Sequence, residues 1–294
     1  MKRILLFAAA NIAVLVVLSI IVRLFGLDDF LAERGGKLGG LLLFSAIFGF
    51  GGAFISLVLS KTMAKLGMGV RVIEQPRDET EVWLFDTVRA YARRLDLGMP
   101  EVGVFDSPQM NAFATGASRN QALVAVSTGL LRGMDRNEAQ AVLGHEMTHV
   151  ANGDMVTMTL LQGVLNTFVI FLARVLGSVI DDALRGGRAQ RSGPGPFYFL
   201  IVIVLQVVFG VLATLIVMAF SRYREFRADA GGARLAGRDN MIEALRALQR
   251  THGEALPGQL QAFGVHGGGA GRSFGGLFMS HPPLEERIAA LRAL

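Results

Sequence analysis

Four long apolar stretches divide the chain, and more polar segments separate them. None of the four contains Asp, Glu, Lys or Arg, and their bounds are 4–22, 39–60, 155–173 and 197–220. An α-helix rises about 1.5 Å per residue, so each stretch is long enough to cross the roughly 30 Å hydrocarbon layer of a bilayer. The pattern therefore predicts four transmembrane helices, of which the second and fourth are the clearest.

Two of these stretches allow another interpretation. Lys2 and Arg3 precede the first, as in a cleaved signal peptide, but the stretch is long for such a segment and no convincing cleavage site follows it. The third contains polar side chains such as Gln162 and Asn166 and ends at Arg174. This composition leaves open a helix packed against protein rather than lipid. We interpret both stretches as membrane spans.

An even number of crossings returns the chain to the side of the membrane on which it began. We predict a membrane hairpin at 1–60, a polar part at 61–154, a second hairpin at 155–220 and a polar part at 221–294. Both polar parts then share one compartment, and a modest excess of Lys and Arg near its membrane border favours the cytoplasm. Arg222 and Arg224, just past the last stretch, are expected to reach lipid headgroups.

Composition agrees with the membrane class. The chain is 52% apolar and 18% charged, against about 25% charged in water-soluble domains, and it is too apolar to remain disordered. Its net charge of +5 comes from scattered basic residues, which suits anionic lipid better than nucleic acid. With no cysteine, it has no disulfide and no thiolate metal site. Its glycine-rich segments lack the strand–turn–helix setting of a phosphate-binding loop, so we expect neither nucleotide nor nucleic acid as a partner.

The first polar part combines helices and strands. One amphipathic helix is predicted at 80–95. A second begins at Asp135, where Glu138 completes a capping-box pattern, and runs toward Gly153. Between the two helices lie short strand-like runs at 101–105, 111–115 and 122–127.

The second helix carries the sequence HEMTH. His145 and His149 are four residues apart, so they share one helical face, about 6 Å between Cβ atoms, and can bind one cation. Glu146 is rotated away from that axis and is placed to take a proton from an attacking water. Two unrelated helix histidines are the alternative, but five histidines in 294 residues produce this spacing only rarely by chance.

A tetrahedral zinc ion with one open position needs a third protein ligand. The spacing HExxHxxGxxH is absent, because Asn152 and Met155 stand at its last two positions. Glu225 and Asp229 lie one helical turn apart just after the fourth stretch, and a hairpin of the last two spans brings Glu225 to the depth of His149. Asp229 can then accept the free N–H of a ligand histidine. Alternatively, both carboxylates only balance neighbouring arginines on a solvated face.

Four segments together resemble the HtpX-type membrane-bound zinc metalloproteases, which are related to the CAAX prenyl endopeptidases and to the wider gluzincin class. The segments are HEMTHVANGDMVTMTLLQGVLNTFVIFLAR, SRYREFRADAGGARLAG, NAFATG and SHPPLEERIAAL, and the likeness runs nearly end to end. It implies that His145, His149 and Glu225 bind zinc and that Glu146 is the general base. The implied fold is a mainly α-helical integral membrane protein with a cytoplasmic α+β zincin-like domain that carries a small β-sheet.

The same resemblance implies two further roles. Asn111, Ala112, Phe113 and Ala114 are similar to the edge strand that pairs with the substrate main chain, although an ordinary β turn with a buried Phe fits them too. His281 in the HPP motif is expected near the oxyanion, and a structural histidine at a helix start is the equal alternative.

We therefore expect a membrane-bound zinc endopeptidase with one Zn²⁺ per chain. The resemblance implies polypeptide substrates, namely misfolded or damaged membrane proteins, cleaved at the cytoplasmic face of a bacterial-type inner membrane in stress-linked quality control. A transporter would place charged groups at mid-membrane depth, whereas the histidine pair and Glu225 lie outside the apolar stretches. A zinc-binding scaffold would leave Glu146 without a role.

Overall fold

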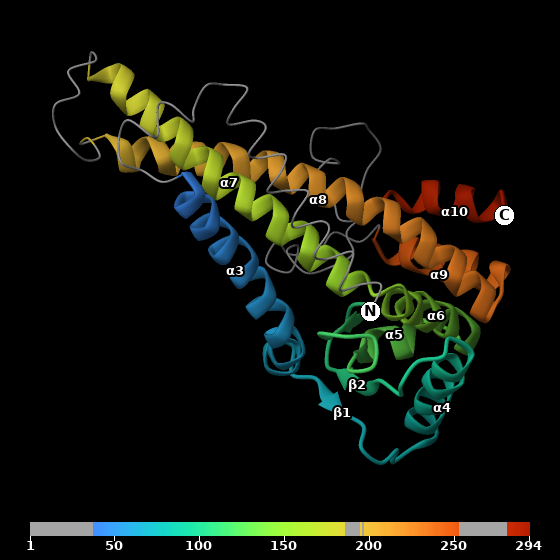
Figure 1. Cartoon of the computed structure of the whole chain (residues 1–294). Coiled ribbons are helices and arrows are strands. Elements are labelled where there is room, and N and C mark those ends of the chain that lie inside the picture. The colour runs from blue at the N-terminus through green and yellow to red at the C-terminus, as the bar shows by residue number, and fades with distance from the viewer. Residues whose placement is uncertain (1–37, 186–194, 196, 253–280) are drawn as a thin grey trace. The chain divides into compact units, whose positions relative to one another are not determined.

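The computed structural model describes residues 38–185, 195, 197–252 and 281–294 (Figure 1). The first predicted span, 4–22, lies outside these residues. Contacts divide the chain into two compact units, one of Met1–Ile55 and Thr159–Val217, the other of Ser56–Met158 and Met218–Leu294. We call the first the membrane unit and the second, which holds the residues predicted to be catalytic, the catalytic unit.

Three described helices are long and apolar enough to cross a membrane. They are α3 (Leu38–Gly67), α7 (Asp154–Leu184) and α8 (Tyr198–Ala236), and they contain the last three predicted stretches except for Phe197. Each helix runs past its apolar stretch into charged residues. Lys61 and Lys65 in the last turns of α3, for example, both pair with Glu101. The protein is thus a largely helical integral membrane protein, as predicted.

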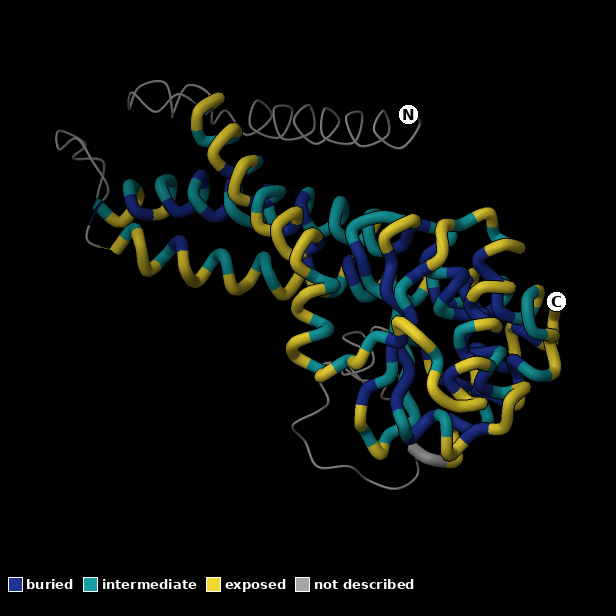
Figure 2. Tube along the Cα trace, turned by 90° about the horizontal axis from the view of Figure 1, so that it is seen from below, coloured by how far each residue is buried: buried dark blue, intermediate teal, exposed yellow. Residues whose placement is uncertain are grey.

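Fully buried residues gather mainly in the catalytic unit (Figure 2). In the membrane unit, α3 and α8 leave many apolar side chains exposed, whereas those of α7 are mostly buried or half-buried. Phe199 and Val207 on α8, for example, are 68% and 62% exposed, as suits a lipid-facing surface. The two amide side chains in the apolar part of α7 pair with each other within the helix, because Gln162 Nε2 donates to Asn166 Oδ1 at 2.8 Å. These amides therefore do not prevent α7 from lying in a membrane.

A four-stranded mixed sheet lies in the catalytic unit, in the order β1-β2-β4-β3. β4 is completely buried and pairs in parallel with β2 and antiparallel with β3. β3 is an edge strand. The strands are β1 (Arg71–Val72), β2 (Glu101–Phe105), β3 (Ala112–Thr115) and β4 (Leu123–Ser127). The last three match the predicted runs, and the two-residue β1 was not predicted.

The helix α6 (Arg136–Asn152) passes through the core of the catalytic unit. It packs against α4 (Glu79–Arg94), α9 (Arg238–His252) and strands β3 and β4. Its start is the predicted capping box, in which Asp135 Oδ1 accepts from Glu138 N at 2.8 Å and Glu138 Oε2 accepts from Asp135 N at 3.0 Å. Two shorter helices complete the unit, α5 (Thr128–Gly133) after β4 and α10 (Leu284–Arg292) against α9.

Candidate metal centre

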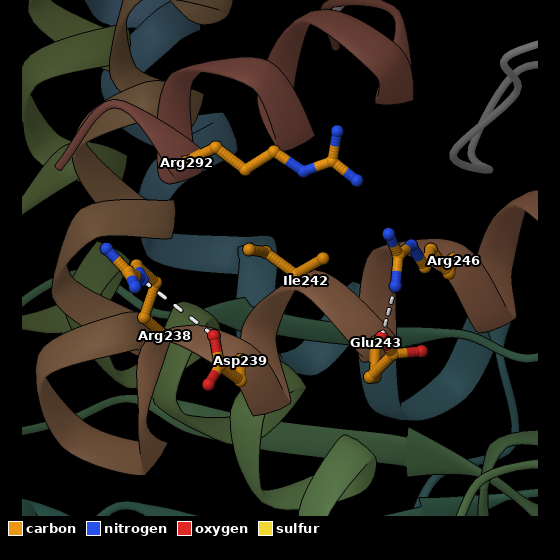
Figure 3. A pocket seen from close by; sticks show the side chains of 6 residues that line it. All are labelled: Arg238, Asp239, Ile242, Glu243, Arg246 and Arg292. Carbon is orange, nitrogen blue, oxygen red and sulfur yellow. Dashed lines mark hydrogen bonds and ion pairs between the residues drawn. The ribbon is translucent and has the colours of Figure 1, made fainter.

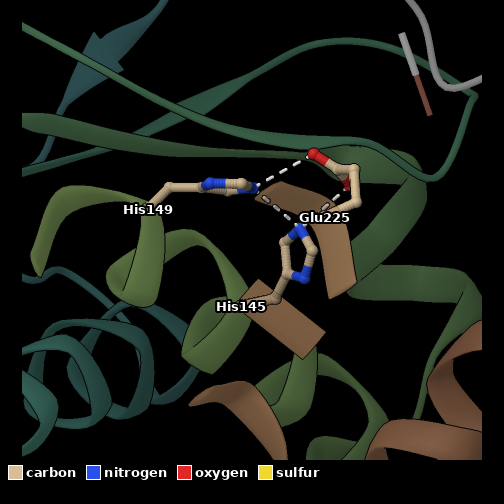
Figure 4. A group of neighbouring side chains, drawn as sticks. All are labelled: His145, His149 and Glu225. Carbon is tan, nitrogen blue, oxygen red and sulfur yellow. Dashed lines mark hydrogen bonds and ion pairs between the residues drawn. The ribbon is translucent and has the colours of Figure 1, made fainter. Parts of the chain in front are cut away.

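Three side chains from two helices converge on one point in the catalytic unit. His145 and His149 come from α6 and Glu225 from α8, and Figure 4 shows both imidazoles turned toward the carboxylate. The two Nε2 atoms are 3.1 Å apart, His149 Nε2 is 3.3 Å from Glu225 Oε1, and His145 Nε2 is 3.5 Å from Glu225 Oε2. The structure brings together the three residues that the sequence nominates as metal ligands.

The other nitrogen of each imidazole faces a carboxylate. His145 Nδ1 is 2.9 Å from Asp229 Oδ1, and His149 Nδ1 is 2.6 Å from Asp154 Oδ2. Because an ionised carboxylate only accepts hydrogen bonds, each Nδ1 carries the proton in the neutral ring. Each Nε2 then presents its lone pair to the centre.

Two lone pairs and a carboxylate that face one another form a site for a cation. The candidate ligand atoms all lie within 4.8 Å of one another, and Glu225 Oε2 is buried without a hydrogen-bond partner in the described part of the chain. Two nitrogens bound to a tetrahedral zinc ion at about 2.0–2.1 Å would be about 3.3 Å apart, close to the separation of the two Nε2 atoms. Two imidazoles and one carboxylate therefore fit such an ion.

The surroundings of the histidines are strongly acidic. Burial lowers the pKa of His145, but its contacts with Asp229 and Glu225 outweigh burial and raise this pKa to about 10. The pKa of His149 is raised as well, because contacts with Asp154 and Glu225 outweigh the effect of burial. The carboxylates thus favour positive charge at the centre, and a divalent cation can supply it in place of protons.

Two glycines let α8 approach α6 closely enough to deliver Glu225. A Cβ at Gly231 would lie 2.3 Å from Thr148 Cγ2, and a Cβ at Gly232 would lie 3.0 Å from the backbone nitrogen of His145. A side chain at Gly231 would overlap the side chain of Thr148, and one at Gly232 would press on the backbone of His145. The Gly-Gly pair therefore permits the close approach of α8 to the helix that carries the two histidines.

A third glycine forms the joint between α6 and α7. Gly153 has φ 65° and ψ 38°, a left-handed conformation that L-residues with a side chain rarely adopt. Its N–H lies against the carbonyl oxygens of His149 and Val150 and ends α6. The sharp joint lets Asp154, the first residue of α7, reach the imidazole five residues before it.

Glu146 lies beside the two histidines, and its side chain is half-buried. It makes no hydrogen bond or ion pair with any residue that the structure describes. Its charge nevertheless acts on Arg287. Burial lowers the pKa of Arg287, but its acidic neighbours Asp229, Glu225 and Glu146 outweigh burial and raise this pKa overall. A carboxylate next to a metal centre and free of structural partners is suited to proton transfer.

β3 presents main-chain groups at the open edge of the sheet. The backbone carbonyl of Asn111 accepts from Ser127 N at 2.8 Å, so hydrogen-bonded and non-hydrogen-bonded pairs alternate from there along β3 and β4. Phe113 then bonds inward to Ala125, while the N–H and C=O of Ala112 and Ala114 point outward. The segment is a strand rather than a turn, and Phe113 is only half-buried.

His281 lies directly against the candidate ligands. Its Nδ1 is 2.7 Å from Glu225 Oε2, although the two atoms are not aligned as a hydrogen bond. The side chain is 28% exposed, and α10 begins three residues later at Leu284. This position is compatible with either of the roles that the sequence suggests for this histidine.

Three polar residues of the centre were missed in the sequence. Asp154 contacts His149, Arg224 contacts Asp154, and Arg287 contacts Asp229. The expectation that Arg224 reaches lipid headgroups is wrong, because its side chain turns to Asp154 and is 12% exposed. Arg287 did carry a signal, since a charged residue stands there on the same helical face as Leu284 and Leu291.

A separate surface pocket opens along α9 and α10, with a volume of about 250 Å³ (Figure 3). No residue of the metal centre lines it. Two of its arginines face carboxylates of the same pocket, Arg246 with Glu243 and Arg238 with Asp239. It is therefore a polar surface hollow and not an extension of the metal centre.

Comparison with known proteins adds independent evidence. The model of the family described as "Peptidase family M48" matches residues 78–294. The chain is 59% identical over 297 residues to "Protease HtpX" of Thioalkalivibrio sulfidiphilus, covering 100% of this chain and 99% of the relative. It is 60% identical over 293 residues to the protein of the same name from Xanthomonas euvesicatoria, covering 99% and 97%.

One solved structure shares the fold. The crystal structure of S. mikatae Ste24p superimposes with a TM-score of 0.62 over 98% of this chain and 67% of that one, at 18% identity. At this level of identity the likeness concerns the fold alone. It extends across both the long helices and the catalytic unit.

Proposed function

This chain belongs to peptidase family M48 and is a membrane metalloprotease, and we propose that His145, His149 and Glu225 hold a single zinc ion at its active centre. The convergence of two lone pairs and one carboxylate supports this ligand set. Asp229 holds the Nδ1 proton of His145, which fixes the ring so that Nε2 faces the metal.

Zinc, when bound, supplies a Lewis acid that polarises the scissile carbonyl and lowers the pKa of water to about 7. Glu146 accepts a proton from the attacking water and passes it to the leaving amine. Its half-buried carboxylate has no structural partner among the described residues, so it is free to take both roles. His281 lies against Glu225. From there it either donates a hydrogen bond to the oxyanion or has the structural role of contacting the proposed ligand Glu225.

The substrate adds a strand to the open edge of the sheet. Ala112 and Ala114 offer outward N–H and C=O groups, so they bind the main chain of an extended peptide without selecting its side chains. Asn111 and Phe113 hold this edge in place from the inner side. The backbone of Asn111 is hydrogen-bonded to Ser127, and Phe113 pairs with Ala125. Binding of this kind suits an enzyme that cleaves unfolded segments of varied sequence.

We further propose that the centre works at the cytoplasmic face of a bacterial inner membrane, on misfolded or damaged membrane proteins, as part of a stress response. Glu225 stands five residues beyond Phe220, the last residue of the fourth apolar stretch, on the same continuous helix. The active centre therefore belongs close to a membrane surface. Lys and Arg near the ends of the spans favour the cytoplasmic side.

The observation that carries the proposal is a partner-free Glu146 beside a ready-made three-ligand site. We expect E146Q to retain zinc and the fold but to lose proteolysis by about 10²–10⁴-fold, because the amide cannot accept a proton. The test uses the purified full chain in liposomes, with casein and a co-reconstituted membrane protein as substrates. E79Q, which changes an exposed carboxylate on α4, is the matched control.

Chelation should abolish cleavage by the wild-type chain, and added zinc should restore it. Cleavage by E146Q at the wild-type rate would contradict the proposed base. Cleavage that resists exhaustive metal removal would contradict the metal mechanism itself. Cleavage of casein without any cleavage of membrane proteins would contradict the proposed substrate class alone.

A further inference from the structure

The second histidine of the metal centre has its own supporting carboxylate. Asp154 Oδ2 is 2.6 Å from His149 Nδ1, and the Asp154 side chain is 9% exposed. Asp154 is also the first residue of α7, the helix that continues into the third apolar stretch. The ring of His149 is therefore fixed by a residue at the very start of a membrane helix.

Arg224 supports this carboxylate from the other membrane helix. Its Nε is 3.2 Å from Asp154 Oδ2, an ion-pair contact in which the two atoms are not aligned as a hydrogen bond, and its NH1 donates to the backbone carbonyl of Asp154 at 3.2 Å. Arg224 immediately precedes Glu225 on α8. One turn of this helix therefore provides both the proposed ligand Glu225 and the arginine that contacts Asp154, the carboxylate next to His149. Two contacts from one guanidinium hold both the side chain and the backbone of Asp154.

The two histidines have parallel surroundings. His145 contacts Asp229, which pairs with Arg287, and His149 contacts Asp154, which pairs with Arg224. In both cases an arginine-bound carboxylate accepts the Nδ1 proton. The two arginine–carboxylate pairs differ in the helices that they connect. Only the pair next to His149, Asp154 with Arg224, joins the beginning of α7 to α8.

We propose that Asp154 and Arg224 are positioning residues, which orient His149 for metal binding and fasten α6 to the two membrane helices at the centre. This inference rests on the proposed role of His149 and Glu225 as ligands. A carboxylate on Nδ1 fixes the tautomer and raises the basicity of Nε2, and loss of such a partner typically weakens metal binding 10–100-fold.

The test measures metal binding rather than proteolysis. The full-length chain in detergent micelles is stripped of metal and titrated with Co²⁺ in competition with a chelator, while the visible absorption of the bound Co²⁺ is recorded. The variants are D154N, R224Q and R224K, with E225A as the variant that lacks a proposed ligand. D86N and R227Q are matched controls, because both change exposed residues, and Arg227 lies on the same helix as Arg224.

We expect D154N to weaken Co²⁺ binding about 10–100-fold and to alter the absorption bands. R224Q should have a smaller effect in the same direction, and R224K should recover part of it because it restores the charge. The controls should match the wild type. R224Q and R224K keep the proposal testable if D154N fails to fold.

Two results would overturn the proposal. Wild-type affinity and spectra in D154N and R224Q, with binding lost in E225A, would show that the ligand set is right and that these two residues do not position it. A lower melting temperature of the metal-free variants, with unchanged affinity and spectra, would reduce them to structural residues. Unchanged binding by E225A would instead overturn the ligand set, and with it the proposed metal centre.

Discussion

Arg287 and Asp229 form a buried, two-pronged ion pair that ties the C-terminal helix to the candidate metal centre. Arg287 NH2 donates to Asp229 Oδ1 at 2.6 Å, and Arg287 Nε donates to Asp229 Oδ2 at 2.8 Å. Because Asp229 also accepts from His145, the last helix of the chain acts on the first candidate ligand through one carboxylate.

Removal of this arginine should destabilise the catalytic unit. R287A leaves Asp229 buried without its cation, and we expect a loss of about 3–5 kcal/mol in the free energy of unfolding. R287K should lose less, because it keeps the charge but not the two-pronged geometry. Denaturant titration of the full chain in detergent measures both. R292A, at an exposed position of the same helix, should stay within about 0.5 kcal/mol of the wild type; an equal loss in R292A would contradict a specific role for Arg287.

A proline in the edge strand β3 should have different effects at outward-facing and inward-facing positions. The N–H of Ala114 points outward, so A114P should fold normally while losing a hydrogen bond to the substrate. We expect at least about a 10-fold fall in kcat/KM, at an unchanged metal content. F113P is the contrasting variant, because it removes an inward N–H of the sheet and should lower the melting temperature. Full activity in A114P would contradict strand addition at β3.

The absence of cysteine from the chain allows a direct test of its topology. We expect a single cysteine introduced as D86C, at an exposed position of α4, to react with a membrane-impermeant maleimide in inside-out vesicles but not in intact cells stripped of their outer membrane. R188C, in the loop predicted to lie on the opposite side, should show the reverse. Labelling of D86C from outside would contradict the cytoplasmic assignment.

Local features of the fold were readable from the sequence because their causes are local. The capping box of Asp135 and Glu138, the end of α6 at Gly153 and the short apolar run of β4 depend on residues a few positions apart. The spacing of His145 and His149 places them on one face whatever surrounds the helix. The proposed third ligand needed one further step, namely that a membrane hairpin brings Glu225 back to the level of His149.

The residues that contact the candidate ligands were harder to predict, since they come from distant parts of the chain. Arg287 pairs with a carboxylate 58 residues away, and Arg224 contacts a residue 70 positions away. At a membrane border the sequence offers Arg224 an equally good partner in lipid headgroups, and only the packing of α7 and α8 decides between them. The strand β1 is two residues long, too short to leave a periodic pattern.

X-ray absorption at the zinc edge tests most directly whether two imidazoles and one carboxylate surround a single ion. For the zinc-loaded wild-type chain we predict one zinc per chain, with nitrogen and oxygen neighbours at about 2.0–2.2 Å and the outer-shell scattering of two imidazole rings. In E225A the zinc content should fall, and the spectrum of the residual zinc should change. Full zinc occupancy with an unchanged spectrum in E225A would contradict the proposed centre.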